Sequence, residues 1–292
     1  MNFVKRWQTP EFLLLGIGSS LIAFHLTLIS KATGNFNQMM LSGFFWCAIL
    51  SGLWHKRQTL NLTSNLGSTI SGLFLILWML IRSLLSHNYD DVLSFFSPFI
   101  SAFGLALLAS GFSGCKQYWR ELSIVWILAF PLAILLGYVD RGLAITTIDA
   151  KLATFFLWYI GFEVTREGVQ VILPTGAIEI YLGCSSLQAV ISLAQLSLLV
   201  SLLFPLRVYQ ILVMLGGGVL IALSVNAVRL GLMAFLVANS DQSAFQYWHG
   251  SQGGQIFSTL SFVLFGALVY CLLEFFPVDS EKVPGQDSST QS

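Results

Sequence analysis

Residues 208–237 read VYQILVMLGGGVLIALSVNAVRLGLMAFLV and carry a single charged side chain, Arg229. A helix of this length is about 45 Å long at 1.5 Å per residue, whereas the hydrocarbon core of a membrane is only about 30 Å thick. The segment therefore predicts a transmembrane helix whose C-terminal end leaves the hydrocarbon or breaks. Arg229, with Asn226 three residues before it, lies near that end.

The rest of the chain has the same apolar character. It has 292 residues, of which 55% are hydrophobic and only 10% are charged, and its mean hydropathy is +0.77. A soluble domain has about 25% charged residues, so the composition predicts an all-α polytopic membrane protein with a single membrane domain, residues 1–276. The polar tail, 277–292, is expected to be disordered. Eight transmembrane helices are predicted at about 12–29, 36–54, 66–85, 92–112, 122–139, 185–204, 208–237 and 256–276.

The segment between the fifth and sixth predicted spans follows a different pattern. Its apolar piece, 152–162, is too short to cross a membrane, and we interpret it as an interfacial or re-entrant helix with Trp158 and Tyr159 at headgroup level. Residues 169–171 and 178–180 then alternate on either side of a Pro-Thr-Gly turn, which predicts a small β-hairpin. Open sheet edges do not survive in lipid, so we expect this hairpin in water at the membrane face.

Basic residues flank the predicted spans unevenly. With the N-terminus inside, the inner loops hold pairs such as Lys56 with Arg57 and Lys116 with Arg120, while the short outer loops hold only Lys31. Basic residues favour the cytoplasmic side, so we predict a multi-pass protein of the cell (inner) membrane with residues 140–183 outside. If 152–162 did span, residue 184 would move to the inner side. The net charge is zero and gives no indication of a nucleic-acid partner.

Three polar segments are predicted at one depth. Cys184 comes at the outer start of the span 185–204, and Arg229 comes about 20 residues into the next span, enough to reach the outer boundary. His249 lies in the polar stretch 239–255, interpreted as an outer loop. The three residues should therefore meet at the outer, extracytoplasmic surface of the membrane.

Each of the three has two interpretations. A helix N-terminus lowers the pKa of a thiol, and Gly183 would permit the turn while Ser185 and Ser186 cap the helix; alternatively, Cys184 is a small structural residue. Arg229 in an apolar segment is a candidate functional residue, supported by Asn226, or it reaches up to lipid headgroups. His249 is a candidate acid–base or an ordinary interfacial residue.

Together the three residue types suggest acyl transfer. Cys184 would attack a carbonyl as the nucleophile, His249 would move protons as general acid and base, and Arg229 would stabilise the oxyanion or the substrate. Gly183, Ser185 and Asn226 would support them. The sequence contains no metal-binding or phosphate-loop motif, so we expect neither a metal nor a cofactor.

The three motifs resemble those of the exosortase/archaeosortase family of membrane-embedded cysteine transpeptidases. The resemblance rests on Gly183-Cys184-Ser185-Ser186-Leu187, Asn226-Ala227-Val228-Arg229 and Trp248-His249-Gly250, in that order, at the outer ends of the last three spans. The short form with a polar tail is most similar to the cyanobacterial branch. One position departs from the pattern, because Ser186 stands where the family often has glycine.

This resemblance implies a substrate and partners. The family acts on secreted proteins with a C-terminal sorting signal made of a Pro-Glu-Pro motif, a transmembrane helix and a basic cluster. It is thought to cut near the motif and to transfer the protein to an acceptor, in connection with exopolysaccharide export. By similarity, Cys184, Arg229 and His249 would be the catalytic residues, membrane lipid would surround the enzyme, and the acceptor stays unknown.

Two other functions remain open from the sequence. A polytopic transporter could use Arg229 and Asn226 in a permeation path, although transporters more often carry charges in several spans and repeated halves. A non-catalytic membrane subunit would use the three polar segments only to anchor its helices. Replacement of Cys184 separates these functions, because only the enzyme depends on its thiol.

Overall fold

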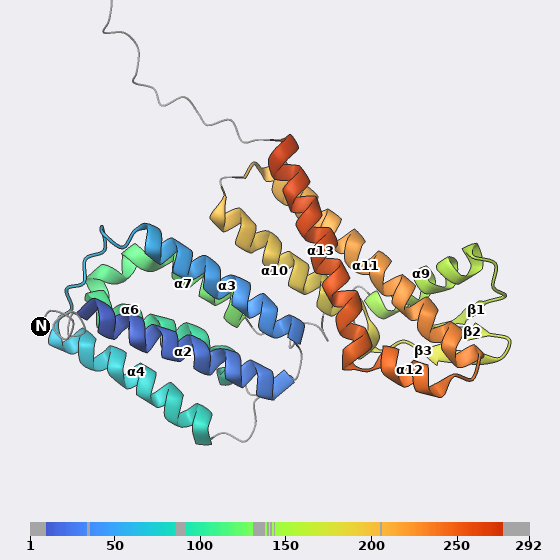
Figure 1. Ribbon diagram of the computed structural model, residues 1–292, viewed down its shortest axis with the longest axis horizontal. Helices are drawn as coiled ribbons and strands as arrows, with labels where there is room; N and C mark the ends of the chain where they lie inside the picture. The colour runs from blue at the N-terminus through green and yellow to red at the C-terminus, as the bar shows by residue number, and fades with distance from the viewer. Residues whose placement is uncertain are drawn as a thin grey trace, which may run out of the picture.

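The computed structural model describes residues 10–33, 36–85, 92–130, 138, 140, 142, 144–204 and 206–276. The predicted tail, 277–292, lies outside the described residues, and so do residues 131–137 of the predicted span 122–139. Within the described chain nearly all of the structure is helical, with one small sheet. Figure 1 shows the N-terminal helices grouped together, the C-terminal helices α10, α11 and α13 beside them, and the sheet at the far end of α11.

In the described residues up to 130, the N-terminal group has six α-helices. Their bounds are α2 Pro10–Thr33, α3 Phe36–His55, α4 Leu66–Leu85, α5 Val92–Phe95, α6 Ser97–Gly114 and α7 Trp119–Ala129. The predicted span 92–112 is broken between α5 and α6 at Phe96. Helices α4 and α6 pack so closely that a Cβ on Gly72 would lie 2.5 Å from the carbonyl oxygen of Gly104. Small residues allow such backbone contact between helices in membranes.

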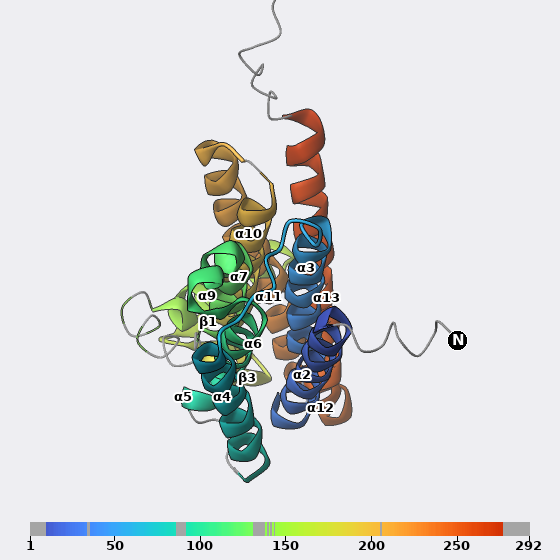
Figure 2. The same cartoon turned by 90° about the vertical axis from the view of Figure 1, so that its left-hand side faces the viewer.

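The C-terminal group begins with a helix outside the bundle. Helix α9 (Ile145–Tyr159) precedes the sheet, and α10 (Leu187–Leu203), α11 (Val208–Ala238), α12 (Gln242–His249) and α13 (Ser251–Phe275) follow it. Helix α11 is continuous over 31 residues. It therefore does not break, and it is longer than one membrane thickness, which is the first of the two possibilities given in the sequence analysis. Figure 2 shows α10 and α13 extending beyond the N-terminal group at one end.

The predicted β-hairpin is present and has a third strand. Strands β1 (Thr165–Glu167), β2 (Gln170–Leu173) and β3 (Gly176–Glu179) form an antiparallel sheet in the order β1-β2-β3. Pairs such as Val171 with Ile178 fix the register between β2 and β3. The sequence analysis missed β1, and its predicted strands, 169–171 and 178–180, differ from the observed ends by one or two residues.

Six segments of the described chain are long and apolar enough to span a membrane: Phe12–Lys31, Phe36–His55, Leu66–Leu85, Ser97–Ala129, Val208–Ala238 and Ser251–Phe275. The segment Ser97–Ala129 contains both α6 and α7, which contact each other. Helix α10 is apolar but has only 17 residues. The structure thus confirms a polytopic α-helical membrane fold, while eight crossings stay a prediction.

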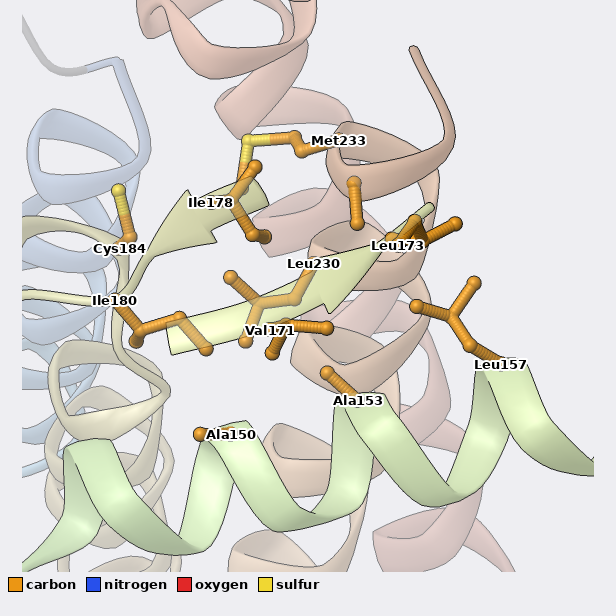
Figure 3. Packing of buried hydrophobic residues seen from close by; sticks show 11 residues of the cluster. Ala150, Ala153, Leu157, Val171, Leu173, Ile178, Ile180, Cys184, Leu230 and Met233 are labelled. Atoms are coloured by element: carbon orange, nitrogen blue, oxygen red, sulfur yellow. The ribbon is translucent and has the colours of Figure 1, made fainter. Parts of the chain in front are cut away.

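A compact hydrophobic cluster joins α9, the sheet and the C-terminal end of α11. Leu157 of α9, Val171 of β2 and Leu230 of α11 are at most 1% exposed. Figure 3 shows residues of α9, the sheet and α11 converging, with Cys184 at the edge of the cluster, and α9 and α11 also contact each other directly. The part of α11 that exceeds one membrane thickness therefore has its own protein core to pack against, and this core fixes the position of Cys184.

Candidate active site

Cys184 ends a short 3₁₀ turn, Leu182–Cys184, between the sheet and α10. Its backbone N–H donates to the carbonyl of Tyr181 at 2.8 Å, and its own carbonyl accepts from the Asn226 amide at 3.1 Å. The residue is only 4% exposed. Asn226, predicted as a supporting residue of Arg229, thus holds the backbone of Cys184.

His249 is the last residue of α12 and faces Cys184. Its Nδ1 lies 3.7 Å from the Cys184 Sγ, across 65 residues of sequence. Phe245, one turn earlier on α12, stacks on the imidazole with ring centroids 5.3 Å apart and planes within 10°. The segment interpreted as an outer loop is partly helical, while its side of the membrane stays a prediction. Residues 242–249 form a helix, capped by the Asp241 carboxylate, which accepts from the Ala244 N–H at 3.0 Å.

Tyr181 is a site residue that the sequence analysis missed. Its hydroxyl lies 3.3 Å from Nε2 of His249, so both nitrogens of the imidazole have a partner. The pKa of Tyr181 is raised, chiefly by the negative charge of a Cys184 thiolate. The phenol therefore stays a proton donor beside the thiol. Nothing in the sequence distinguishes this tyrosine from other interfacial aromatic residues.

Arg229 reaches the same place from α11. Its guanidinium donates to the backbone carbonyl of His249 at 3.3 Å, and it lies against Gly254 of α13, where a Cβ would be 3.2 Å from one of its nitrogens. The Nε atom is buried without a hydrogen-bond partner among the described residues. Arg229 is thus held within the protein, and the interpretation as an arginine that only reaches lipid headgroups does not fit these contacts.

Asp149 is a second residue that the sequence analysis left without a role. It lies on α9, is 0% exposed, and its Oδ2 accepts from the Ser186 N–H at 2.8 Å and the Ser186 hydroxyl at 3.2 Å. Burial raises the pKa of Asp149, and the bonds from Ser186 oppose this rise. A carboxylate beside an apolar segment was the available signal. Ser186, the departure from the family pattern, here supplies a hydroxyl that glycine lacks.

The pKa of Cys184 differs from the prediction. Burial raises it, while the charge of Arg229 and a hydrogen bond from Tyr181 act in the opposite direction. Helix α10 begins at Leu187, three residues after Cys184, and the effect of a helix terminus fades within one turn. The expectation of a lowered thiol pKa from the helix N-terminus was therefore wrong. The groups that favour the thiolate are the side chains of Arg229 and Tyr181.

The two remaining supporting residues act through the turn. The Ser185 hydroxyl donates to the carbonyl of Leu182 at 3.0 Å and accepts weakly from the Leu187 N–H at 3.4 Å. A Cβ on Gly183 would meet only the Tyr181 ring, at 3.7 Å, and its backbone has no positive φ. Glycine is therefore not required at position 183 for the turn, contrary to expectation.

A thiol, an imidazole and a guanidinium thus lie close together, on the turn before α10, at the end of α12 and on α11. A thiol 3.7 Å from an imidazole nitrogen can pass its proton to that nitrogen, and a neighbouring guanidinium can stabilise negative charge. These are the parts of a cysteine acyl-transfer site. Their catalytic roles stay predictions.

Comparison with protein families agrees with this arrangement. The sequence model of the family described as transmembrane exosortase matches residues 33–266, a range that includes all three motifs and most of the bundle. The chain therefore belongs to the exosortase family, a class of membrane cysteine transpeptidases. Comparisons with curated proteins and with solved structures gave no match. Membership of the cyanobacterial branch stays a prediction.

Proposed function

We propose that this protein is a cysteine peptidase and transpeptidase that cuts the C-terminal Pro-Glu-Pro-type sorting signals of secreted proteins. The observation that carries the proposal is the approach of the Cys184 Sγ to Nδ1 of His249 at 3.7 Å in a chain of the exosortase family. The site lies at the outer face of the cell (inner) membrane, and the cut protein passes to an acceptor, in connection with exopolysaccharide export.

The first half of the reaction forms a thioester. The Cys184 thiol gives its proton to Nδ1 of His249, and the thiolate attacks the carbonyl carbon of the scissile peptide bond. The Arg229 guanidinium stabilises the negative oxygen of the tetrahedral intermediate. The C–N bond then breaks, and the imidazolium of His249 donates its proton to the leaving amine.

The second half releases the substrate. A nucleophile, an amine acceptor or water, attacks the thioester carbonyl and gives its proton to His249. The C–S bond breaks, and the thiolate of Cys184 takes that proton back. The half-buried position of His249 leaves room for an acceptor to approach from the outer surface.

The test is processing of a secreted reporter that ends in a Pro-Glu-Pro motif, a transmembrane helix and a basic cluster. Wild-type protein should shorten the reporter, and Cys184→Ala should leave it at full length. Cys271→Ala is the matched control, because Cys271 is an exposed thiol of α13 remote in sequence from the site motifs. Normal shortening by Cys184→Ala would exclude Cys184 as the nucleophile and with it the cysteine mechanism.

A further inference from the structure

A cavity of about 590 Å³, lined by both polar and apolar residues, extends from the candidate site into the bundle. Arg229 and His249 line its mouth, and α3, α10 and α13 supply much of its wall. Along α10 the polar lining residues are Gln188, Ser192 and Gln195. Their spacing of four and three residues places them on one face of the helix. The cavity therefore follows α10 inward from the level of Cys184.

Helices α3 and α13, which lie across the cavity from α10, also contribute polar side chains to its wall. Helix α13 contributes Gln255 and Ser258, and α3 contributes Asn37, Gln38 and Ser42. Among the described lining residues Arg229 is the single arginine, and none is aspartate, glutamate or lysine. The wall thus consists of hydroxyl and amide groups with apolar residues between them, in a chain whose other helix faces are mostly apolar.

Several of these groups have no hydrogen-bond partner among the residues that the structure describes. Gln188, Ser192 and Gln255 make no side-chain hydrogen bond to any described residue, whereas Gln195 donates to the carbonyl of Ile127 at 3.0 Å. Polar groups in membrane-spanning helices are costly unless they meet a partner or water. Three unpartnered groups facing one cavity indicate that water fills it or that a ligand with hydrogen-bonding groups does.

The chemistry of the wall selects the type of ligand. Serine hydroxyls and glutamine amides each donate and accept hydrogen bonds, and this suits a ligand with alternating N–H and C=O groups. An extended polypeptide has that pattern, and it cannot enter the hydrocarbon with its backbone groups unsatisfied. A polyanionic ligand would require several cations, and a cationic one would require carboxylates, which the described wall lacks.

The length of the cavity fits a short peptide. From Ser186 to Gln195 the wall along α10 is about 14 Å long at 1.5 Å per residue. An extended chain rises about 3.3 Å per residue, so this wall faces about four residues of substrate. We propose that the cavity binds about four residues of the substrate next to the scissile bond in extended conformation, below the membrane surface; this inference rests on the proposed function.

The proposal predicts what a photoreactive side chain in the cavity will contact. In full-length protein with Cys184→Ala, p-benzoylphenylalanine at position 192 should cross-link to the reporter at residues within about four positions of the cut. The matched control carries the same group at position 201 of α10. Ser201 lies outside the cavity lining and donates to the carbonyl of Leu198 at 2.7 Å, so this position should give no such cross-link.

A second pair of variants measures the consequence. Ser192→Leu fills the cavity and should slow reporter shortening at least about fivefold, while Ser201→Leu should not. The rate of Cys184 alkylation by iodoacetamide should be the same in both variants and in the wild type, which shows that the catalytic residues stay in place.

The outcomes separate this inference from the proposed function. Reporter shortening by the wild type without a cross-link at position 192 overturns the peptide cavity alone, and so does normal shortening by Ser192→Leu. Cross-links that recur every three to four residues of the reporter also overturn it, because they would show a helical occupant. A reporter that is neither shortened nor cross-linked overturns both the function and the cavity.

Discussion

Removal of the Tyr181 hydroxyl should make Cys184 less reactive at neutral pH. The hydroxyl lies 3.3 Å from Nε2 of His249, and a hydrogen bond from Tyr181 lowers the pKa of the Cys184 thiol against the larger rise caused by burial. In the reactive state the imidazolium donates to the Tyr181 oxygen while the phenol donates to the thiolate. Tyr181→Phe removes both interactions and leaves the ring in place.

The expected magnitude follows from the hydrogen bond and its exposure. A hydrogen bond to a charged group contributes about 1.5–3 kcal/mol. Tyr181 is 55% exposed, so water replaces part of the lost bond, and we expect a net loss of about 1 kcal/mol. This loss raises the thiol pKa, and at pH values below that pKa the thiolate fraction falls about fivefold.

The assay is the rate of iodoacetamide alkylation of Cys184 between pH 6 and pH 10, followed by mass spectrometry in protein with Cys47, Cys115 and Cys271 replaced by alanine. The groups that face Cys184 and Tyr181 are His249 from α12, Arg229 from α11 and Glu179 from β3. All of them are kept in this variant.

The midpoint of the alkylation profile should shift to higher pH in Tyr181→Phe, and the two profiles should converge above it. Tyr159→Phe is the control, since Tyr159 is 76% exposed on α9 and lies away from the thiol. An unchanged midpoint, or a shift to lower pH, would refute the role of the Tyr181 hydroxyl.

Three further substitutions test other contacts of the site. Asp149→Ala leaves the N–H at the start of α10 without its acceptor and should destabilise the protein by about 1–3 kcal/mol, measured by thermal unfolding in detergent; Asp149→Asn keeps an acceptor oxygen and should lose less. Gly253→Ala would place a Cβ 2.4 Å from the Cα of Trp248, displace the end of α12 and reduce reporter processing at least about tenfold, whereas Gly266→Ala, with nothing within 4 Å, should process normally. Arg229→Lys keeps the charge but loses the planar fork, so processing should fall at least about tenfold; normal processing would show that the charge alone suffices.

The apolar helices could be predicted well because their signal is local. The span predicted at 66–85 matches α4, Leu66–Leu85, at both ends, and α11 begins at Val208 as predicted. Where the local signal is weak the prediction failed. Helix α12 is short and polar, so it resembled a loop, and β1 has only three residues, Thr165–Glu167, with no apolar alternation.

The site could be predicted in part, because depth in a membrane can be counted along a helix. That count placed Cys184, Arg229 and His249 at one level, and the structure brings them together. Counting depth could not identify Tyr181 or Asp149. Tyr181 contacts His249, 68 positions later in the sequence, and Asp149 contacts Ser186, 37 positions later. It also could not show that α10 begins only at Leu187, three residues after Cys184, and so it gave the wrong direction for the thiol pKa.

The most direct test of the central claim is capture of the acyl-enzyme. Wild-type protein is mixed with the Pro-Glu-Pro reporter, quenched in acid and digested, and the peptide that contains Cys184 is examined by mass spectrometry. We predict a reporter fragment joined to Cys184 through a thioester that hydroxylamine releases. Shortening of the reporter without any such adduct, and equally in Cys184→Ala, would contradict the assignment of Cys184 as the nucleophile.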